Sequence, residues 1–63
     1  MKINTTKIEK YRKRAQMTMA AFAKLIGIQT STYFYIIKKA TTKFKTVDKI
    51  AKVMDVESKD LLI

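Results

Sequence analysis

The sequence predicts an all-α protein of five short helices that form one domain over residues 1–63. Two observations lead to this fold class. Apolar residues recur at intervals of three and four, which is the spacing of an amphipathic helix, and the alternation typical of a half-buried strand is missing. No linker, repeat or low-complexity segment divides the chain into separate units.

The first helix is expected from about Thr6 to Ala15, with Thr5 or Thr6 as its N-cap. Its inner face is formed by Ile8, Tyr11 and Ala15. These three residues lie three or four positions apart, and residues at that spacing share one side of a helix.

The second helix is expected over residues 19–26, because Thr18 precedes it as an N-cap and the only glycine, Gly27, follows it. Glycine is common at this position because it adopts the left-handed conformation easily. Met17, before the cap, has the spacing of a hydrophobic staple to Phe22. The inner face of this helix comprises Phe22, Ala23, Leu25 and Ile26.

The third helix is expected from about Thr30 to Lys39. At 100° per residue, its two faces separate clearly. The inner face comprises Tyr33, Ile36, Ile37 and Ala40. The outer face comprises Ser31, Tyr35 and Lys38, with Thr30 and Phe34 at its edges.

The remaining residues predict a loop and two more helices. Residues 40–43 are polar and form the loop. Asp55 ends the fourth helix, since Asp is among the few residues that tolerate the left-handed region. Residues 56–63 form a short fifth helix. The fourth helix is marked by Phe44, Val47, Ile50, Ala51 and Met54.

The charge of the chain is large and uneven. The formal net charge is +9 at pH 7. Residues 1–52 contain 13 basic and two acidic residues, whereas residues 53–63 contain one basic and three acidic residues. Such a positive field indicates a polyanionic partner, either nucleic acid or an anionic membrane.

Catalysis is not expected from this composition. The chain has no Cys and no His, which removes the thiolate nucleophile, the Ser-His pair and the imidazole metal ligand. The acids are scattered and are interpreted as solvated helix charges, and a single glycine excludes a Gly-rich phosphate loop. We therefore expect no enzyme activity, no metal and no cofactor.

The segment from Thr18 to Ile37 carries the functional motif. It reads T-M-A-A-F-A-K-L-I-G-I-Q-T-S-T-Y-F-Y-I-I, two short helices that meet at Gly27, with the small Ala23 four residues earlier. Ala23 permits close approach of the helices, and Gly27 permits the positive φ of the turn. The outer face of the second of these helices is then free to enter a major groove.

The chain resembles the Cro/C1-type helix-turn-helix family of phage repressors and their bacterial relatives. The similarity runs from Ile8 to Leu62. It implies a lambda-repressor-like DNA-binding domain with its helix-turn-helix at helices two and three. The markers are I-x-x-Y-R at residues 8–12, M-T at 17–18, F-A-K-L-I-G at 22–27, K-I-A at 49–51 and D-V-E-S-K-D-L-L at 55–62.

The resemblance implies that one set of residues contacts bases and another set contacts phosphates. The start and outer face of the third helix are expected to contact base edges through Gln29, Thr30, Ser31, Phe34 and Tyr35. The N-terminus of the second helix and the loop after the third are expected to contact phosphates through Thr18, Met19, Ala20, Lys38, Lys39, Thr41, Thr42, Lys43 and Lys45. No acid occupies the first turn of the second helix, so its dipole is free to face an anion.

Several positions depart from the family pattern. Relatives commonly carry Gln where Met19 stands, and Met does not make that phosphate bond. They often pair the residue at Arg12 with a Glu where Ile37 stands here, so Arg12 must find another acid or face phosphate. The recognition face has no Arg and no Asn, which removes the bidentate contact to guanine. For Phe34, a place in the core and a base contact are equally expected.

The expected function is sequence-specific binding of double-stranded DNA by a transcriptional regulator, most simply a phage or mobile-element repressor at the nucleoid of the bacterial cytoplasm. The operator is expected to be palindromic and A·T-leaning. We expect a homodimer that is weak when free. Its surface is the apolar end formed by Leu61, Leu62 and Ile63, one of which completes the core.

The alternatives belong to other functional classes. A small protein-interaction module, such as an antitoxin or anti-repressor partner, would dock through Phe34 and Tyr35. A membrane-active peptide needs one long amphipathic helix, whereas Gly27 and the polar loop divide this chain, and no segment is long enough to span a membrane. RNA binding fits the charge, but the aromatic-platform signatures are absent.

Overall fold

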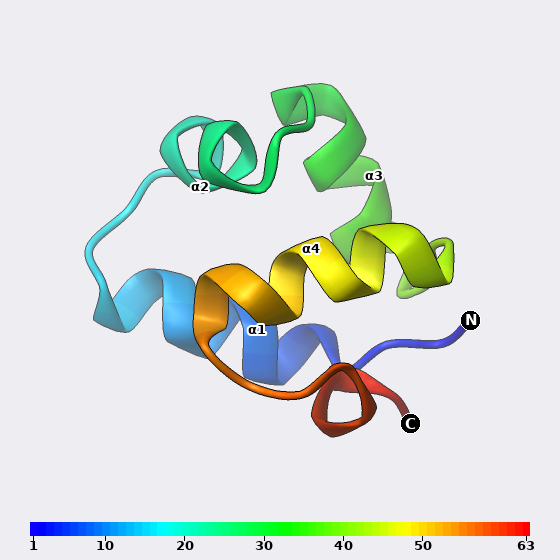
Figure 1. Cartoon of the computed structure of the whole chain (residues 1–63). Coiled ribbons are helices and arrows are strands. Elements are labelled where there is room, and N and C mark those ends of the chain that lie inside the picture. Colours follow the sequence, from blue (N-terminus) through cyan, green and yellow to red (C-terminus); the bar gives the residue numbers. More distant parts are fainter.

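The computed structural model describes all 63 residues and contains four α-helices and one 3-10 turn (Figure 1). The elements are α1 (Thr5–Arg14), α2 (Met19–Ile26), α3 (Thr30–Lys39), α4 (Phe44–Met54) and η1 (Ser58–Leu61). α2 packs against α3 and α4, while η1 packs against α1 and α4. The all-α fold class is therefore confirmed. No helix has both the length and the apolar composition that crossing a membrane requires.

The ends of α2 and α3 lie where the sequence predicts. Thr18 caps α2, and its hydroxyl oxygen accepts a hydrogen bond of 3.1 Å from the amide of Ala21. Gly27 ends α2 in the left-handed region with φ +92°. α3 spans Thr30–Lys39 as expected. Asp55 ends α4 at φ 58°, so the prediction of a left-handed Asp is also confirmed.

α1 lies within one residue of its predicted limits, but its predicted N-cap and the inward placement of Ala15 were wrong. Asn4, rather than Thr5 or Thr6, is the N-cap, because its side-chain oxygen reaches the amide of Lys7 at 3.1 Å. Ala15 is the C-cap residue and is exposed instead of packing inside. On α2, Leu25 is 60% exposed, so its assignment to the inner face was also wrong.

The expected fifth helix is a four-residue 3-10 turn. Glu57 and Asp60 form a reciprocal capping box around it, in which the Glu57 amide donates to the Asp60 carboxylate at 3.3 Å. The chain then becomes extended at Leu62, which bridges Ile3 in antiparallel fashion. This pairing stops the helix, because the backbone of Leu61 accepts a hydrogen bond from Asn4 instead.

Three short segments are joined by isolated bridges and backbone hydrogen bonds into a structure that we call the terminal ribbon: residues 1–4, 40–42 and 61–63. Lys2 bridges Thr41 on one side, and Ile3 bridges Leu62 on the other. Hydrogen bonds run from the Ile3 amide to Ala40 at 3.0 Å and from the Asn4 amide to Leu61 at 2.7 Å. The ribbon therefore fixes the loop after α3 against both ends of the described chain. Sequence periodicity did not indicate it, because each segment is too short to show alternation.

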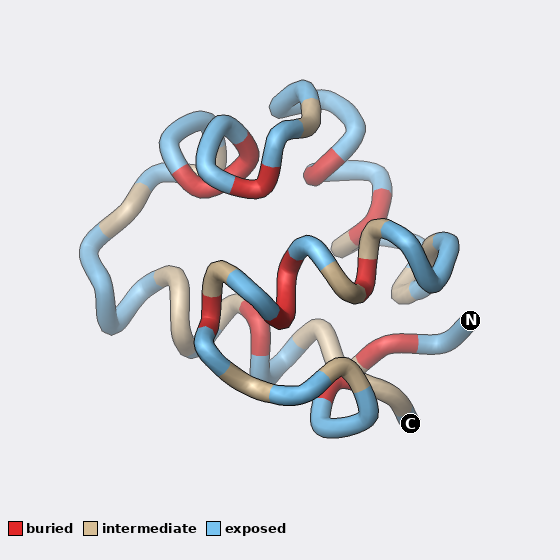
Figure 2. Tube along the Cα trace, in the orientation of Figure 1, coloured by how far each residue is buried: buried red, intermediate tan, exposed pale blue.

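The core consists of 12 buried residues, none of them polar or charged, and Figure 2 shows them on the sides of the helices that face one another. Phe22 and Tyr33 are the two largest, and their rings meet edge to face at a centroid distance of 5.4 Å. The remaining ten are Ile3, Ile8, Ala23, Ile26, Ile36, Val47, Ile50, Ala51, Met54 and Leu61. α3 is thus anchored by its inner face.

Candidate nucleic-acid interface

The outer face of α3 is open to solvent. Tyr33 and Ile36 hold the opposite face in the core, with 0% and 4% of their surface exposed. Gln29 is the N-cap residue, but its side chain forms no capping hydrogen bond and stays free. The residues predicted to contact bases are all exposed: Gln29, Thr30, Ser31, Phe34 and Tyr35.

Two aromatic rings stand on this exposed face. Phe34 is 54% exposed and Tyr35 is 59% exposed. The alternative that Phe34 folds back into the core was therefore wrong. The ammonium of Lys39, one helical turn later, lies 5.9 Å from the centroid of the Tyr35 ring. This is within the range of a cation–π contact, which restrains the ring without burying it.

The first turn of α2 presents unpaired backbone amides. The amides of Met19 and Ala20 donate no hydrogen bond within the chain, and the first turn of the helix contains no acidic residue. The partial positive charge of a helix N-terminus is therefore uncompensated here. The oxygen of Thr18 already accepts the Ala21 amide, so its hydroxyl can still act as a donor.

The loop after α3 is held by the terminal ribbon and meets the outer face of α3 in one groove. This groove has a volume of about 630 Å³. Thr32 and Tyr35 line it from α3, and Thr41, Thr42 and Lys43 line it from the loop. The Thr41 hydroxyl donates to the Met1 carbonyl at 2.8 Å, so it is not a free donor. Tyr35, predicted to contact bases, thus lies beside residues predicted to contact phosphates.

The lysines of this region carry uncompensated charge. The ion pairs of the chain involve only Arg12, Lys52 and Lys59 among its basic residues. The following lysines are exposed and form no ion pair: Lys38, Lys39, Lys43 and Lys45. At the start of α4, the amides of Phe44 and Lys45 also lack a partner within the chain. The sequence analysis did not predict this second open helix N-terminus, although it did include Lys45 among the phosphate contacts.

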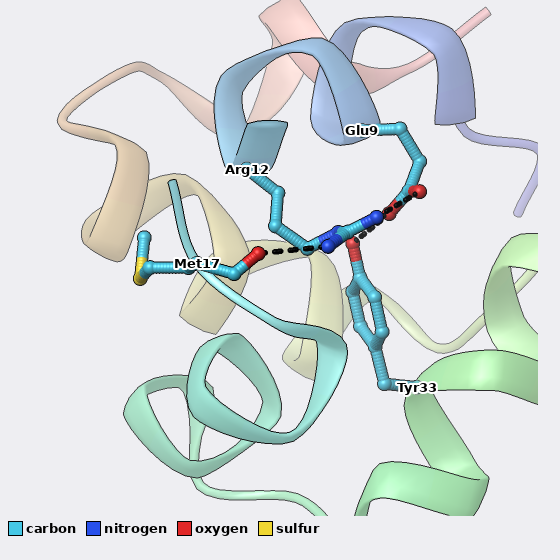
Figure 3. A network of polar contacts seen from close by, with 4 residues as sticks. All are labelled: Glu9, Arg12, Met17 and Tyr33. Carbon is cyan, nitrogen blue, oxygen red and sulfur yellow. Dashed lines mark hydrogen bonds and ion pairs between the residues drawn. The ribbon is translucent and has the colours of Figure 1, made fainter. Parts of the chain in front are cut away.

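A partly buried polar network joins α1 to α3 (Figure 3). Two guanidinium nitrogens of Arg12 donate to the Glu9 carboxylate at 2.9 and 2.8 Å. A third nitrogen donates to the Met17 carbonyl at 2.8 Å, and the Tyr33 hydroxyl donates to Glu9 at 2.7 Å. Only 12% of the Arg12 side chain and 18% of the Glu9 side chain are exposed. The network therefore connects α1, the turn before α2, and α3.

This network supplies the acidic partner that Arg12 lacks because Ile37 stands where relatives often carry Glu. Arg12 finds another acid, as one of the two expectations required, and the acid is Glu9 on its own helix. The interpretation of Glu9 as a solvated charge was wrong, because the Tyr33 hydroxyl and Arg12 enclose it. A possible signal was the spacing of Glu9 and Arg12, three residues apart on one helix face.

The ionisation of these groups follows from their contacts. The hydrogen bonds from Arg12 lower the pKa of Glu9 below its ordinary value, against the opposing effect of burial. The hydrogen bonds to Glu9 raise the pKa of Arg12. Burial, followed by the hydrogen bond to Glu9, raises the pKa of the Tyr33 phenol. The network is therefore a carboxylate between a guanidinium and a neutral phenol.

The comparison with protein families agrees with this geometry. A family model described as helix-turn-helix matches residues 8–61 of the chain. The chain belongs to the Cro/C1-type helix-turn-helix family, and it is a DNA-binding regulator of that class. Searches of curated proteins and of solved structures gave no match.

Proposed function

We propose that the chain is a sequence-specific transcriptional repressor of the phage or mobile-element type, acting on a double-stranded operator at the nucleoid of the bacterial cytoplasm. The observation that carries the proposal is the outer face of α3, which is open to solvent while its inner face is anchored in the core. A helix held in this way enters the major groove as a rigid body. All 63 residues act as one DNA-binding unit in this proposal.

Base contacts come from the start and outer face of α3. The residues that we assign to this role are Gln29, Thr30, Ser31, Phe34 and Tyr35. Threonine methyl groups and aromatic rings pack against the methyl group of thymine, whereas guanine is read best by arginine, which this face lacks. The half-sites should therefore lean towards A·T pairs.

Phosphate contacts flank the base contacts on two sides. On one side, the free amides of Met19 and Ala20 and the hydroxyl of Thr18 bind a phosphate at the N-terminus of α2. On the other side, the Thr41 amide and the Thr42 hydroxyl are available to the duplex, because the Thr42 amide and the Thr41 hydroxyl already donate to the Met1 carbonyl. The lysines that we assign to phosphates are Lys38, Lys39, Lys43 and Lys45.

In this proposal a homodimer binds a palindromic operator. The two copies associate only weakly in the absence of DNA. Leu61 is fully buried in the core of the single chain, so it does not form part of the dimer surface, and it is the residue that completes the core. Half-buried Leu62 and Ile63, which is 85% exposed, remain available for a second copy. A two-fold pair places the recognition helices about 34 Å apart, one turn of DNA.

Salt dependence of DNA binding tests the proposal. With roughly 6–10 phosphate contacts per bound dimer, duplex affinity should fall about 10³- to 10⁵-fold between about 50 and 200 mM salt. Fluorescence anisotropy with a labelled duplex measures this, and selection from random DNA should yield A·T-leaning half-sites. A flat salt response would contradict DNA binding, and G·C-rich half-sites would contradict the assigned base contacts.

Sedimentation of the complex tests the dimer. The free chain should be monomeric at low concentration and should form a 2:1 complex with a full operator. A 1:1 complex on a palindrome at saturation would exclude the dimer.

The exposure of Phe34 and Tyr35 favours one second candidate, a protein-interaction module such as an antitoxin or anti-repressor partner. In that case the two rings would be the docking surface, and binding of the partner would be insensitive to salt. The anisotropy titration therefore separates the two candidates.

A further inference from the structure

A second cationic surface lies between α1 and the end of α4. It is a groove of about 380 Å³, a size typical of ligand sites. The α1 residues that line it are three or four positions apart and so share one face of the helix. The lining residues are Lys7, Lys10, Tyr11 and Arg14 of α1, with Met54 and Val56 opposite.

The floor of the groove is apolar. Met54 is 7% exposed, and Tyr11 and Val56 are half-buried. The Tyr11 hydroxyl donates to the Val53 carbonyl at 3.3 Å, so this tyrosine offers its ring to the groove rather than a free polar group. An occupant would therefore gain contacts from an apolar side chain here.

The rim of the groove is positive and unpaired. Lys10 and Arg14 are exposed and form no ion pair. Lys7 donates only to the backbone carbonyl of Asp60, at 3.3 Å, which leaves its charge uncompensated. No acidic side chain lines the groove. Glu9 is the single acid of α1, and Arg12 and Tyr33 already occupy it.

The groove is separate from the DNA-binding surface. None of its lining residues belongs to the sets that we assign to bases or phosphates. In Figure 1 the C-terminal ends of α1 and α4 lie at the left, below α2, whereas α3 lies at the upper right. The groove can therefore be occupied while α3 is on a duplex.

We propose that this groove binds an acidic peptide segment of a partner protein, in which an apolar side chain is flanked by Asp or Glu. Charge complementarity selects the carboxylates, and the floor of Tyr11, Met54 and Val56 selects the apolar side chain. A nucleic acid would pair its phosphates with the rim but would leave the floor without a partner. Tyrosine and arginine are also the residues enriched where binding energy concentrates at protein interfaces.

The test uses the whole chain and two synthetic peptides of equal charge. One is a fluorescein-labelled Asp/Glu octapeptide with Leu-Phe at its centre, and the other has Ser-Ser at its centre. The Leu-Phe peptide should bind at least about tenfold more tightly, because only it fills the apolar floor. Equal affinity of the two peptides would overturn the proposal, since charge alone would then explain the binding.

Matched charge reversals locate the binding. The double variant Lys10→Glu/Arg14→Glu should weaken the Leu-Phe peptide by more than about tenfold. Lys24→Glu/Lys49→Glu changes the same charge at exposed sites outside both surfaces and should weaken it far less. Equal losses in the two double variants would overturn the proposal.

Chemical-shift mapping on the unmodified chain does not depend on the folding of any variant. Shifts on peptide addition should concentrate at Tyr11, Met54 and Val56, and shifts confined to α3 would contradict the proposal. A short random duplex added to the complex should leave the peptide bound. Displacement of the peptide from this groove by the duplex would identify nucleic acid as the occupant instead.

Discussion

The phenol of Tyr33 on α3 donates a hydrogen bond of 2.7 Å to the carboxylate of Glu9 on α1, 24 positions earlier in the chain. The same carboxylate accepts two hydrogen bonds from Arg12, which also holds the Met17 carbonyl. Because every polar group of the network is paired, it fixes one arrangement of α3 relative to α1 and the turn before α2. The direction of α3 therefore depends on a polar contact as well as on apolar packing.

Removing the Tyr33 hydroxyl should destabilise the fold. Tyr33→Phe deletes the donor to Glu9 and should lower the free energy of unfolding by about 1.5–3 kcal/mol, the range for a hydrogen bond to a charged group. Urea denaturation measures the change. Tyr35→Phe on the same helix is the matched control, because that ring is 59% exposed, and it should unfold like the parent. Equal losses in both variants would contradict the role of the network.

The stability of the chain should depend on pH through Glu9. The folded pKa of Glu9 is lowered, chiefly by the Arg12 hydrogen bonds. Such a group contributes stability above its unfolded pKa, about 4.3, and this contribution is lost as the pH falls through the folded value. The free energy of unfolding should therefore decrease on acidification below about pH 5.

Replacing the Glu9 carboxylate tests whether this group causes the pH dependence of stability. Glu9→Gln should be less stable at neutral pH and should flatten the acid limb of the curve, measured by urea denaturation across the pH range. Glu57→Gln is the matched control: the side chain is 76% exposed, its amide oxygen can still accept the capping hydrogen bond, and the exposed ion pair to Lys59 contributes little, so this variant should follow the parent curve. An acid limb in Glu9→Gln as steep as in the parent would assign the effect to another group.

Substitutions at Gly27 should cost only backbone strain. A Cβ there would meet no heavy atom within 4 Å, but φ is +92°. Gly27→Ala should therefore destabilise by about 1–2 kcal/mol, and Gly27→Asn by less, because Asn tolerates the left-handed region. Gly27→Val should exceed the effect of about 1 kcal/mol that a compatible glycine change produces. Thermal melts measure the order of destabilisation among the three variants. A Val variant that melts like the parent would show that Gly27 does not need its left-handed conformation.

Truncation of Tyr35 should affect specific binding alone. Tyr35→Ala should cost about 1–3 kcal/mol on the selected operator and almost nothing on random duplex, because phosphate contacts stay intact. Anisotropy titrations on both duplexes measure the difference. Leu25→Ala removes another exposed apolar side chain outside α3 and is the control. A loss of similar size on both duplexes would assign Tyr35 to non-specific binding.

Features that depend on neighbouring residues could be predicted from the sequence. The limits of α2 follow from the hydroxyl of Thr18 and from the backbone freedom of Gly27, and both act within one helical turn. The exposure of Tyr35 and the burial of Tyr33 follow from helical periodicity on α3. For these reasons the exposed face of α3 was predicted correctly.

Features that depend on distant residues could not be predicted in the same way. Glu9 looks like any solvated helix acid until the fold brings the Tyr33 hydroxyl to it. Leu25 has a position compatible with the inner face of a short helix, but no element covers it. Residues 56–63 have helical composition, yet pairing of Leu62 with Ile3 draws the end of the chain into an extended form.

The terminal ribbon has a consequence for the order of folding. α2 and α3 are neighbours in sequence, whereas the ribbon joins Ile3 to Leu62, and contacts between such distant positions require a larger loss of chain entropy. We expect the helix-turn-helix to form early and the ribbon to close last. In pulse-labelling hydrogen exchange during refolding, the Ile3 amide should then become protected later than the amide of Ile50, and simultaneous protection of the two would contradict this order. Residues 40–42 take their place only in that final step, so the speed at which the DNA-binding surface is completed is set by the most distant segments of the chain.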